Sequence, residues 1–413
     1  MNKSDSERIA KYLESLGYIL ASNDSCADVV VITTCGIRQS AEDRVYGLIP
    51  RIKKDNPKSC IILTGCLSER EDVKKRVEEQ VDIWLPIKDL GSLKYKLAGK
   101  DLHGDYADCD YLKFEAKYES DFSAFVPIGN GCNNFCSYCV VPYARGREVY
   151  RDHNEVIKEV KDLLNRGYKE ITLIAQNVNS YISSDKKTDF ADLLKMVNDL
   201  DGDFWLRFST SHPKDMSDKL INTMVDCNKL CHHLHLPAQA GNNYILRAMN
   251  RKYSIEDYLA LIKKVKNKIS DMSFTTDIIV GFPGETGEQF KDTKKLFEKV
   301  GYDMAYIAQY SPRPGTMAEK LKDDVSKEEK KKREEELMAI LRKTSKENNK
   351  KYLHKKIKVL VEGKNKKGEF FGKAENYKSI KFLSNNRDLI GSIVEIEIDE
   401  VNDFGLFGKI KNA

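Results

Sequence analysis

The chain has 413 residues, of which 41% are hydrophobic and 32% are charged, and its formal net charge is +5. This length predicts roughly two to four domains, and the composition is that of a globular protein. No apolar run approaches the roughly 18 residues of a membrane-spanning helix, and the N-terminus lacks an apolar signal region. We therefore expect a cytoplasmic protein with no membrane contact, whose ten cysteines are ligands or buried thiols rather than disulfides.

Helix and strand patterns alternate over the first hundred residues. Apolar residues spaced three and four apart indicate helices, and short continuous apolar runs indicate buried strands. Helices are predicted at 4–18, 40–54 and 68–80, and strands at 28–35, 59–66 and 81–86. This alternation is typical of a doubly wound parallel α/β domain, which we place at residues 1–102.

A second alternating region follows a polar stretch that we interpret as a linker. Strands are predicted at 123–129, 171–176, 204–209, 232–237, 273–280 and 304–310. Helices are predicted between them, at 155–167, 189–200, 218–227, 254–269 and 288–301. Six repeats are fewer than the eight of a closed barrel, so we expect a partial (β/α)6 barrel in a domain at residues 118–346.

Polar residues follow the C-terminal ends of these six strands. In parallel α/β folds such ends form the rim that binds ligands. Polar turns are common after strands in any case, but their presence at all six ends favours an active-site mouth. The rim residues that we single out are Gln176, Asn177, Asn179, Ser209, Ser211, His212, Gln239 and Arg313.

The last part of the chain differs in both pattern and charge. Ser326 and Glu329 form a capping-box pattern that opens a charged helix over 327–352. Short strands are predicted at 356–363, 369–377, 379–385, 392–401 and 405–412, which favours a small OB-like β-barrel at residues 347–413. Residues 346–387 carry 13 Lys and Arg but only 4 Asp and Glu. Such an excess indicates either a nucleic-acid-binding face or a solvated lysine-rich surface.

Three cysteines lie on the loop after the strand predicted at 123–129. They are Cys132, Cys136 and Cys139, spaced four and three positions apart. Zinc, an iron–sulfur cluster, a disulfide and simple packing are all conceivable roles. A structural zinc site needs four ligands, and no His or Cys follows at a zinc-finger interval. Three thiolates around a cubane cluster leave one iron open to a small molecule, which is a catalytic arrangement.

Several stretches resemble the methylthiotransferases of the radical S-adenosylmethionine superfamily, and the resemblance covers essentially the whole chain. They are GCNNFCSYCVVPYARGRE, LIAQNVNSY, TSHP, HLPAQAGNNYILRAMNR, TTDIIVGFPGET and YSPRPGT. The resemblance implies a [4Fe–4S] cluster on Cys132, Cys136 and Cys139 that cleaves S-adenosylmethionine to a 5′-deoxyadenosyl radical. It also implies a C-terminal TRAM domain that binds RNA. It suggests that Tyr138 stacks near the adenine of S-adenosylmethionine. Among the rim residues, we expect Gln176, Ser209 and Gln239 to contact the same cofactor.

Within that family, TTCGIRQSAEDRVYG and AQNVNSY most resemble the branch that acts on N6-isopentenyladenosine beside the anticodon of tRNA. The resemblance implies addition of a methylthio group to C2 of that base, by a monomer that needs an external electron donor and a sulfur source. The branch that acts on threonylcarbamoyladenosine is the nearest alternative. An RNA-binding protein with a purely structural cluster, or with zinc, is an alternative of a different class.

The resemblance further implies an auxiliary [4Fe–4S] cluster on three cysteines of the N-terminal domain. Cys35 and Cys66 match the second and third, and both follow predicted strands whose ends a parallel sheet would bring together. The first has no counterpart before Asn2, so we expect the true start to lie upstream. Otherwise Cys26 or Cys60 would complete the site, but Cys26 precedes its strand, and Cys60 begins its strand at the opposite end from Cys66. The remaining cysteines match no family ligand, and we interpret them as a linker thiol, Cys109, and two helix-end residues, Cys227 and Cys231.

Overall fold

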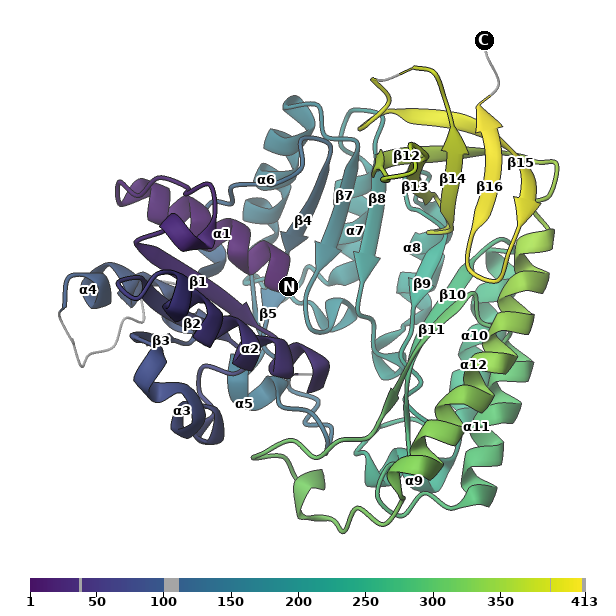
Figure 1. The fold of residues 1–413 in the computed structure, drawn as a ribbon. Coiled ribbons are helices and arrows are strands. Elements are labelled where there is room, and N and C mark those ends of the chain that lie inside the picture. Colours follow the sequence, from purple (N-terminus) through teal and green to yellow (C-terminus); the bar gives the residue numbers. More distant parts are fainter. Residues whose placement is uncertain (37–38, 100–110, 387, 411–413) are drawn as a thin grey trace. The chain divides into compact units, whose positions relative to one another are not determined.

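The computed structural model describes residues 1–36, 39–99, 111–386 and 388–410 (Figure 1). The chain forms two compact units, each built from segments that are separated in the sequence. Unit 1 comprises Met1–Glu119, Pro127–Arg151 and Ser311–Leu321. Unit 2 comprises Ser120–Val126, Asp152–Tyr310 and Lys322–Ala413. Cys109 lies outside the described residues.

Unit 1 contains a parallel sheet of order β1–β2–β3 with helices on both faces. The strands are β1 (Val29–Thr34), β2 (Cys60–Gly65) and β3 (Ile83–Leu85), and the helices are α1 (Asn2–Ser15), α2 (Gln39–Asp55), α3 (Glu71–Val77) and α4 (Leu93–Leu97). Ile61 and Leu63 of β2 pack with apolar residues of α2 and α3. Ile62 packs with Ile9 of α1 on the opposite face, because successive strand residues alternate. The predicted doubly wound α/β arrangement is confirmed.

The middle segment of unit 1 adds two very short strands around a helix. These elements are β5 (Gly129–Asn130), α5 (Val141–Arg145) and β6 (Val149–Tyr150). β5 and β6 pair antiparallel, with Gly129 opposite Tyr150. The pairing closes the base of the loop that carries the cysteine triplet.

Unit 2 contains the predicted partial barrel (Figure 1). Its strands are β4 (Ser123–Pro127), β7 (Glu170–Ile174), β8 (Trp205–Ser209), β9 (His233–His235), β10 (Ser273–Val280) and β11 (Met304–Gln309). They are ordered β4–β7–β8 and β9–β10–β11, and a parallel bridge between Leu206 and Leu230 links β8 to the segment before β9. The helices are α6 (His153–Asn165), α7 (Phe190–Asn198), α8 (Asp218–Asp226), α9 (Asn243–Ala248), α10 (Ile255–Lys268) and α11 (Gly287–Val300). All six predicted strands are confirmed.

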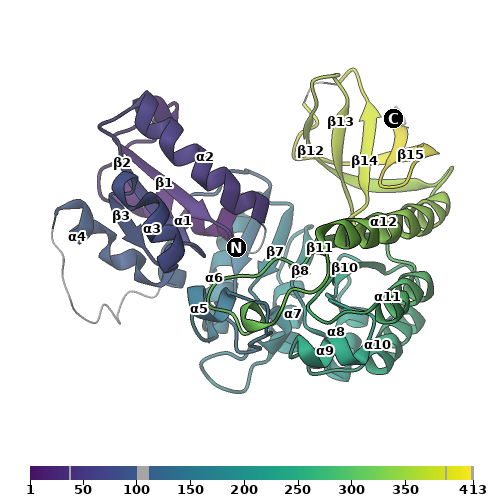
Figure 2. The same ribbon diagram turned by 60° about the horizontal axis from the view of Figure 1, so that its bottom comes forward.

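A long helix leads from this barrel to a small C-terminal barrel (Figure 2). α12 (Lys327–Lys350) begins after Ser326, whose side chain accepts a hydrogen bond from the Glu329 N–H, as the capping pattern predicts. The strands are β12 (Lys356–Lys364), β13 (Phe370–Ala374), β14 (Ser379–Leu383), β15 (Ile393–Val401) and β16 (Leu406–Ile410). They form a closed barrel of order β12–β13–β14–β16–β15, which confirms the predicted fold.

Buried polar contacts fix the C-terminal barrel to the partial barrel within unit 2. Arg207 of β8 donates to a carboxylate oxygen of Glu170 at 2.6 Å and to the carbonyl oxygens of Ala374 and Glu375 at 2.8 and 2.7 Å. The Tyr377 ring stacks on His233 with centroids 4.5 Å apart. These contacts join the turn after β13 to residues near the start or middle of the partial-barrel strands.

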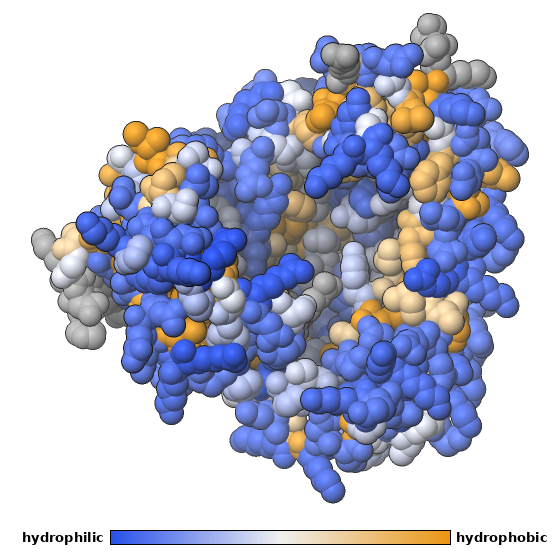
Figure 3. Space-filling model, viewed as in Figure 1, coloured by the Kyte–Doolittle hydropathy of each residue, from blue (hydrophilic) through white to orange (hydrophobic). Residues whose placement is uncertain are grey.

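Hydrophilic residues cover most of the face shown in Figure 3, and apolar residues are exposed there in small groups. Within the described ranges, no helix combines the length and the apolar character needed to cross a membrane.

Candidate metal centre and rim

The cysteine triplet lies on the loop between β5 and α5 in unit 1, and the three residues are partly exposed. The backbone N–H of Cys132 donates to the Gly146 carbonyl oxygen at 3.1 Å, which ties the start of the loop to its return. The N–H of Cys139 donates to the Cys136 carbonyl oxygen at 3.0 Å and closes a turn. The loop is therefore held at both ends by its own backbone.

Electrostatic interactions link the thiols of this loop. Burial raises the pKa of the Cys139 thiol, and the neighbouring Cys136, Cys132 and Cys66 thiols raise that pKa further. Burial is also the main cause that raises the pKa of Cys132, although Asn134 opposes it by donating to the sulfur. A metal ligand is the deprotonated thiolate, so a bound cation would have to offset this raised pKa.

Cys35 and Cys66 lie next to each other at the end of the N-terminal sheet. Cys35 follows β1, Cys66 follows β2, and the strand register pairs Thr34 with Gly65. The Cys66 N–H donates to the Thr34 carbonyl oxygen at 3.2 Å. Gly65 has a φ of +87°, and a Cβ there would lie 2.4 Å from the same oxygen, so the approach requires glycine. The expected juxtaposition of these two cysteines is present.

Gly36 packs between the two groups of cysteines. A Cβ at Gly36 would lie 3.2 Å from Cys66 Cβ and 3.2 Å from a methyl carbon of Val140, the residue after Cys139. The end of the triplet loop therefore meets the Cys35–Cys66 edge of the sheet within unit 1. The absence of a side chain at Gly36 allows this close packing.

Four other described cysteines lie away from these positions. Cys26 is exposed ahead of β1, and Cys60 is the first residue of β2, at the far end of that strand from Cys66. Cys227 is buried at the end of α8, as expected. The interpretation of Cys231 as a helix-end residue is wrong: its N–H donates to the Leu206 carbonyl oxygen and its side chain is buried in the core between the two barrels.

The donor set fits a cluster better than a single ion. Among residues with a described placement, no three His, Cys, Asp or Glu side chains gather closely enough to hold one metal ion. The thiolates of a cubane cluster bind different irons and need not converge on one point. Three thiols on one loop therefore suit a cluster that keeps one iron open.

The rim residues predicted to contact S-adenosylmethionine occupy strand ends of unit 2, except Tyr138, which lies in the turn between Cys136 and Cys139 in unit 1. Ser209 ends β8 opposite Ile174, and Gln176 follows two residues after Ile174. Gln239 has a φ of +67°. Its N–H donates to the Asp277 carbonyl oxygen at 2.9 Å, and its own carbonyl oxygen accepts from the Ile279 N–H at 2.9 Å. The backbone on both sides of the Gln239 side chain is thus fixed.

Side-chain bonds tie the loops after β7 and β8 together. Asn179 donates to the His212 carbonyl oxygen at 2.9 Å and accepts from the His212 N–H at 2.8 Å. Asn177 donates to Asp215 at 2.7 Å. Burial, with Arg251 and Lys214 nearby, lowers the pKa of His212 to about 2, so its ring is neutral.

Arg313 was expected on the same rim but belongs to unit 1. Its guanidinium is buried, donates to the Gln39 side-chain oxygen at 2.7 Å and lies 3.5 Å from Glu42. Ser311–Leu321, which we call the strap, also donates from the Ala318 N–H to the Ser137 carbonyl oxygen at 2.8 Å. The strap thus contacts the start of α2 and the middle of the triplet loop.

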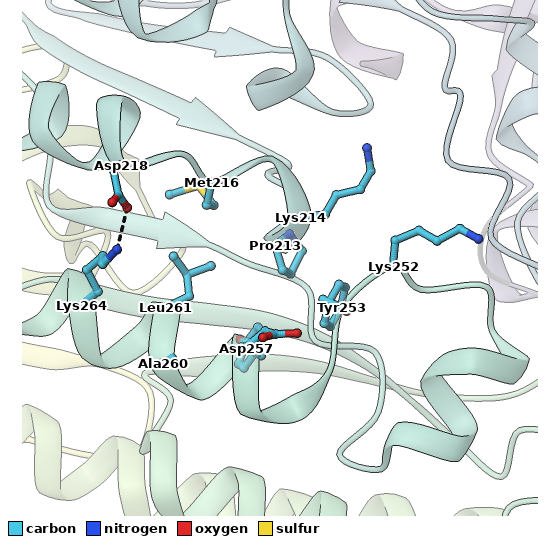
Figure 4. Close-up of a pocket in the computed structure, with 11 residues that line it drawn as sticks. Pro213, Lys214, Met216, Asp218, Lys252, Tyr253, Asp257, Ala260, Leu261 and Lys264 are labelled. Atoms are coloured by element: carbon cyan, nitrogen blue, oxygen red, sulfur yellow. Dashed lines mark hydrogen bonds and ion pairs between the residues drawn. The ribbon is translucent and has the colours of Figure 1, made fainter.

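A cavity of about 390 Å³ lies beside the loop after β8, between that loop and α10 (Figure 4). In Figure 4, Lys214 and Lys252 extend away from the ribbon, whereas Asp218 faces Lys264 across an ion pair of 2.6 Å. The lining includes none of the cysteines. The Lys214 ammonium donates to the Asp215 carboxylate at 2.9 Å, so its charge is paired within its own loop.

The chain is similar to known proteins along nearly all of its length. Three family models match: the radical SAM superfamily at residues 126–297, the uncharacterized protein family UPF0004 at 1–86 and the TRAM domain at 350–411. A protein of Alkaliphilus oremlandii, named tRNA-2-methylthio-N(6)-dimethylallyladenosine synthase, is 40% identical over 428 residues, which cover 99% of this chain and 90% of that protein. A protein of the same name from Acetivibrio thermocellus is 42% identical over 426 residues, which cover 99% and 88%.

Among solved structures, the cobalamin-dependent S-adenosylmethionine radical enzyme OxsB covers 81% of this chain and 49% of its own. Its identity is 12% and its TM-score is 0.46, too low for a detailed comparison.

Proposed function

The chain belongs to the family of tRNA-2-methylthio-N(6)-dimethylallyladenosine synthases, and from this premise we propose that it adds a methylthio group to C2 of N6-isopentenyladenosine beside the anticodon of tRNA. One structural observation supports this proposal independently of the family. Val140, which follows the cysteine triplet, and Cys66 both pack against Gly36, so the end of the triplet loop meets the Cys35–Cys66 edge within a single compact unit. A reaction that joins a radical to a sulfur donor needs two such sites close together.

In this proposal Cys132, Cys136 and Cys139 hold a [4Fe–4S] cluster whose open iron binds S-adenosylmethionine. When bound, that cluster supplies the electron that cleaves the sulfonium and yields the 5′-deoxyadenosyl radical, which removes hydrogen from C2. Tyr138 contributes an aromatic surface beside the cluster loop. Gln176, Ser209 and Gln239 supply polar contacts from the ends of the partial-barrel strands, and the fixed backbone at Gln239 supports such a role.

Cys35 and Cys66 are the proposed ligands of an auxiliary [4Fe–4S] cluster that carries the sulfur. One S-adenosylmethionine supplies the methyl group and a second becomes 5′-deoxyadenosine. The reaction also requires an external electron donor and a source of sulfur. A monomeric state and a cytoplasmic location stay predictions, as do the domain borders near residues 102, 118 and 346.

The C-terminal barrel is the proposed tRNA-binding module. Support comes from the TRAM match and from the excess of Lys and Arg over residues 346–387.

The test is nucleoside analysis after anaerobic reconstitution with S-adenosylmethionine, a reductant and tRNA that lacks the methylthio group. We expect 2-methylthio-N6-isopentenyladenosine and 5′-deoxyadenosine from the unaltered chain. We expect neither product from Cys132→Ala, Cys136→Ala or Cys139→Ala, and both from Cys26→Ala, which alters an exposed thiol outside the site.

Other outcomes point to the alternatives. Methylthiolation of threonylcarbamoyladenosine alone would assign the chain to that branch. tRNA binding without any 5′-deoxyadenosine would indicate an RNA-binding protein with a structural cluster. Iron analysis separates one cluster from two, at about four or about eight irons per chain.

A further inference from the structure

Arg145 is a buried arginine at the end of α5, six residues after Cys139. Its side chain is 2% exposed, and the carboxylate of its ion-pair partner Asp5 is 1% exposed. A buried guanidinium keeps its charge and therefore requires well-placed partners. Burial of this residue has no signal in the sequence, because an isolated arginine has no pattern that predicts it.

The two ends of the Arg145 guanidinium bind different parts of unit 1. Nη1 donates to the Asn130 side-chain oxygen at 3.1 Å, and the Asn130 amide donates back to the Arg145 carbonyl oxygen at 3.4 Å. Asn130 lies in β5, two residues before Cys132, so this end belongs to the triplet loop. Nη2 donates to Asp5 and, at 3.1 Å, to the Asn2 side-chain oxygen, both in α1.

Asn2 continues the connection to the other cysteine group. Its amide donates to the Thr34 carbonyl oxygen at 3.0 Å. The same oxygen accepts the Cys66 N–H, and Thr34 directly precedes Cys35. The Thr34 hydroxyl donates to the Thr64 carbonyl oxygen at 2.6 Å and accepts from the Leu67 N–H at 2.9 Å, which locks the two strand ends together. Two side-chain hydrogen bonds therefore connect Arg145 to the Cys35–Cys66 edge.

We propose that Arg145 is a positioning residue that holds the Cys132–Cys139 loop in a fixed place relative to Cys35 and Cys66. The inference deepens and rests on the proposed function, in which a radical made at one cysteine group must reach a base that meets sulfur at the other. Small displacements of reacting groups cost large factors in rate. The planar fork of arginine reaches both the loop and α1, whereas lysine presents one point charge.

The test uses amide hydrogen exchange, and not enzyme activity, to measure coupling between the Cys132–Cys139 loop and the Cys35–Cys66 edge of the sheet. In a Cys35→Ala/Cys66→Ala background, only the triplet can bind iron. Anaerobic reconstitution should slow amide exchange in residues 29–34 and 60–65 about fivefold or more, the lower end of typical coupling between sites. Arg145→Lys in that background should bind the same iron but lose the slowing.

Arg147→Lys is the matched control. Arg147 lies two residues further along the same loop, is exposed, and places its guanidinium 4.5 Å from the centre of the Phe135 ring rather than on α1. Arg147→Lys should still show slower amide exchange when iron binds. If Arg145→Lys does not fold, Asn2→Ala is the deciding variant. It removes the Asn2 side chain that joins Arg145 to Thr34, leaves the ion pair with Asp5, and should lose the slower exchange at 29–34.

The proposal is overturned if amide exchange still slows on iron binding in Arg145→Lys, or if it does not slow in the Cys35→Ala/Cys66→Ala background. It is also overturned if Arg145→Lys fails to bind iron at the triplet. With all cysteines intact, Arg145→Lys should also raise the ratio of 5′-deoxyadenosine to methylthio product. If the unaltered chain makes no methylthio product although exchange is coupled, the proposed function fails and the positioning role stands.

Discussion

Arg313 donates a hydrogen bond of 2.7 Å to Gln39, the first residue of α2 and the fourth after Cys35. The strap that carries Arg313 also donates from Ala318 to Ser137, between Cys136 and Cys139. One short segment is thus attached beside both groups of cysteines in unit 1. It forms a second connection between them, separate from the one made by Arg145.

Replacing Arg313 should weaken the cluster loop indirectly. Arg313→Met removes the bond to Gln39 and the charge beside Glu42, so the strap is held less firmly where it meets Ser137. We expect iron bound at the triplet to pass to a chelator several-fold faster than in the unaltered protein. Lys320→Met changes an exposed residue of the same strap and should leave the release rate unchanged. Equal rates for Arg313→Met and the unaltered protein would contradict the role of the strap.

Removing Arg207 should loosen the C-terminal barrel. Arg207→Met leaves the buried Glu170 carboxylate unpaired and deletes two bonds to backbone carbonyls. The free energy of unfolding should fall by about 3 kcal/mol. In a Trp84→Phe background, urea unfolding can be followed through Trp205, which lies beside Arg207.

Two further variants separate this effect from a general loss of charge. Glu170→Gln/Arg207→Met should recover part of the loss, because no buried charge is left unpaired. Arg342→Met breaks an exposed 3.1 Å ion pair with Asp403 and should cost less than about 1 kcal/mol. If Arg342→Met costs as much as Arg207→Met, burial is not the deciding factor.

Exposed lysines of the C-terminal barrel should set the salt dependence of tRNA binding. Lys378 is paired with Asp303 and Lys373 donates to Ser379, so both are engaged within unit 2. Lys366 and Lys367, in the turn after β12, are exposed. Their double replacement by Gln should lower the slope of log Kobs against log salt by about two. Lys331→Gln/Lys332→Gln on α12 is the control, and a flat slope in the unaltered protein would favour a merely solvated surface.

Acid should destabilise unit 2 through His212. In the folded protein burial lowers the pKa of His212 from its ordinary value of 6.5 to about 2. Below pH 6.5 the unfolded chain binds a proton that the folded chain excludes, so stability falls as the pH falls. Between pH 7 and 5.5 this group should cost about 1 kcal/mol.

His212→Asn should remove that cost while keeping a side-chain acceptor for the Lys214 N–H. His354→Asn, at an exposed position with a φ of +61°, is the control and should show the acid sensitivity of the unaltered protein. Urea midpoints at pH 7 and 5.5 compare the three proteins. Identical shifts in all three would show that His212 does not govern the acid response.

The repeating elements of both barrels and of the N-terminal sheet follow from local pattern. Ile61, Ile62 and Leu63 form one apolar run, which indicates a strand buried on both faces, and they pack on both faces. The neighbourhood of Cys35 and Cys66 could be predicted for a related reason, because parallel strands of similar length end at one edge. The structural positions of such residues can be predicted because they follow from near neighbours in the sequence.

Features that depend on distant parts of the chain could not be predicted in this way. The two-residue strands β5 and β6 are too short to show a period. Arg145 and Asp5 are separated by 140 positions, and Arg207 and Ala374 by 167. Nothing in the local sequence distinguishes such arginines from solvated ones. Nor does the local sequence indicate that the strap carrying Arg313 packs in unit 1.

The interleaved composition of unit 1 has a consequence for synthesis on the ribosome. Its first 119 residues emerge well before its last segment, Ser311–Leu321, and much of unit 2 is made in between. At about 5–20 residues per second, this delay is on the order of 10–40 s. During that time the nascent N-terminal sheet lacks the strap that later meets α2. A chaperone or iron that binds in this interval would therefore meet unit 1 without its last segment. We expect the speed of translation between residues 119 and 311 to affect the yield of folded protein.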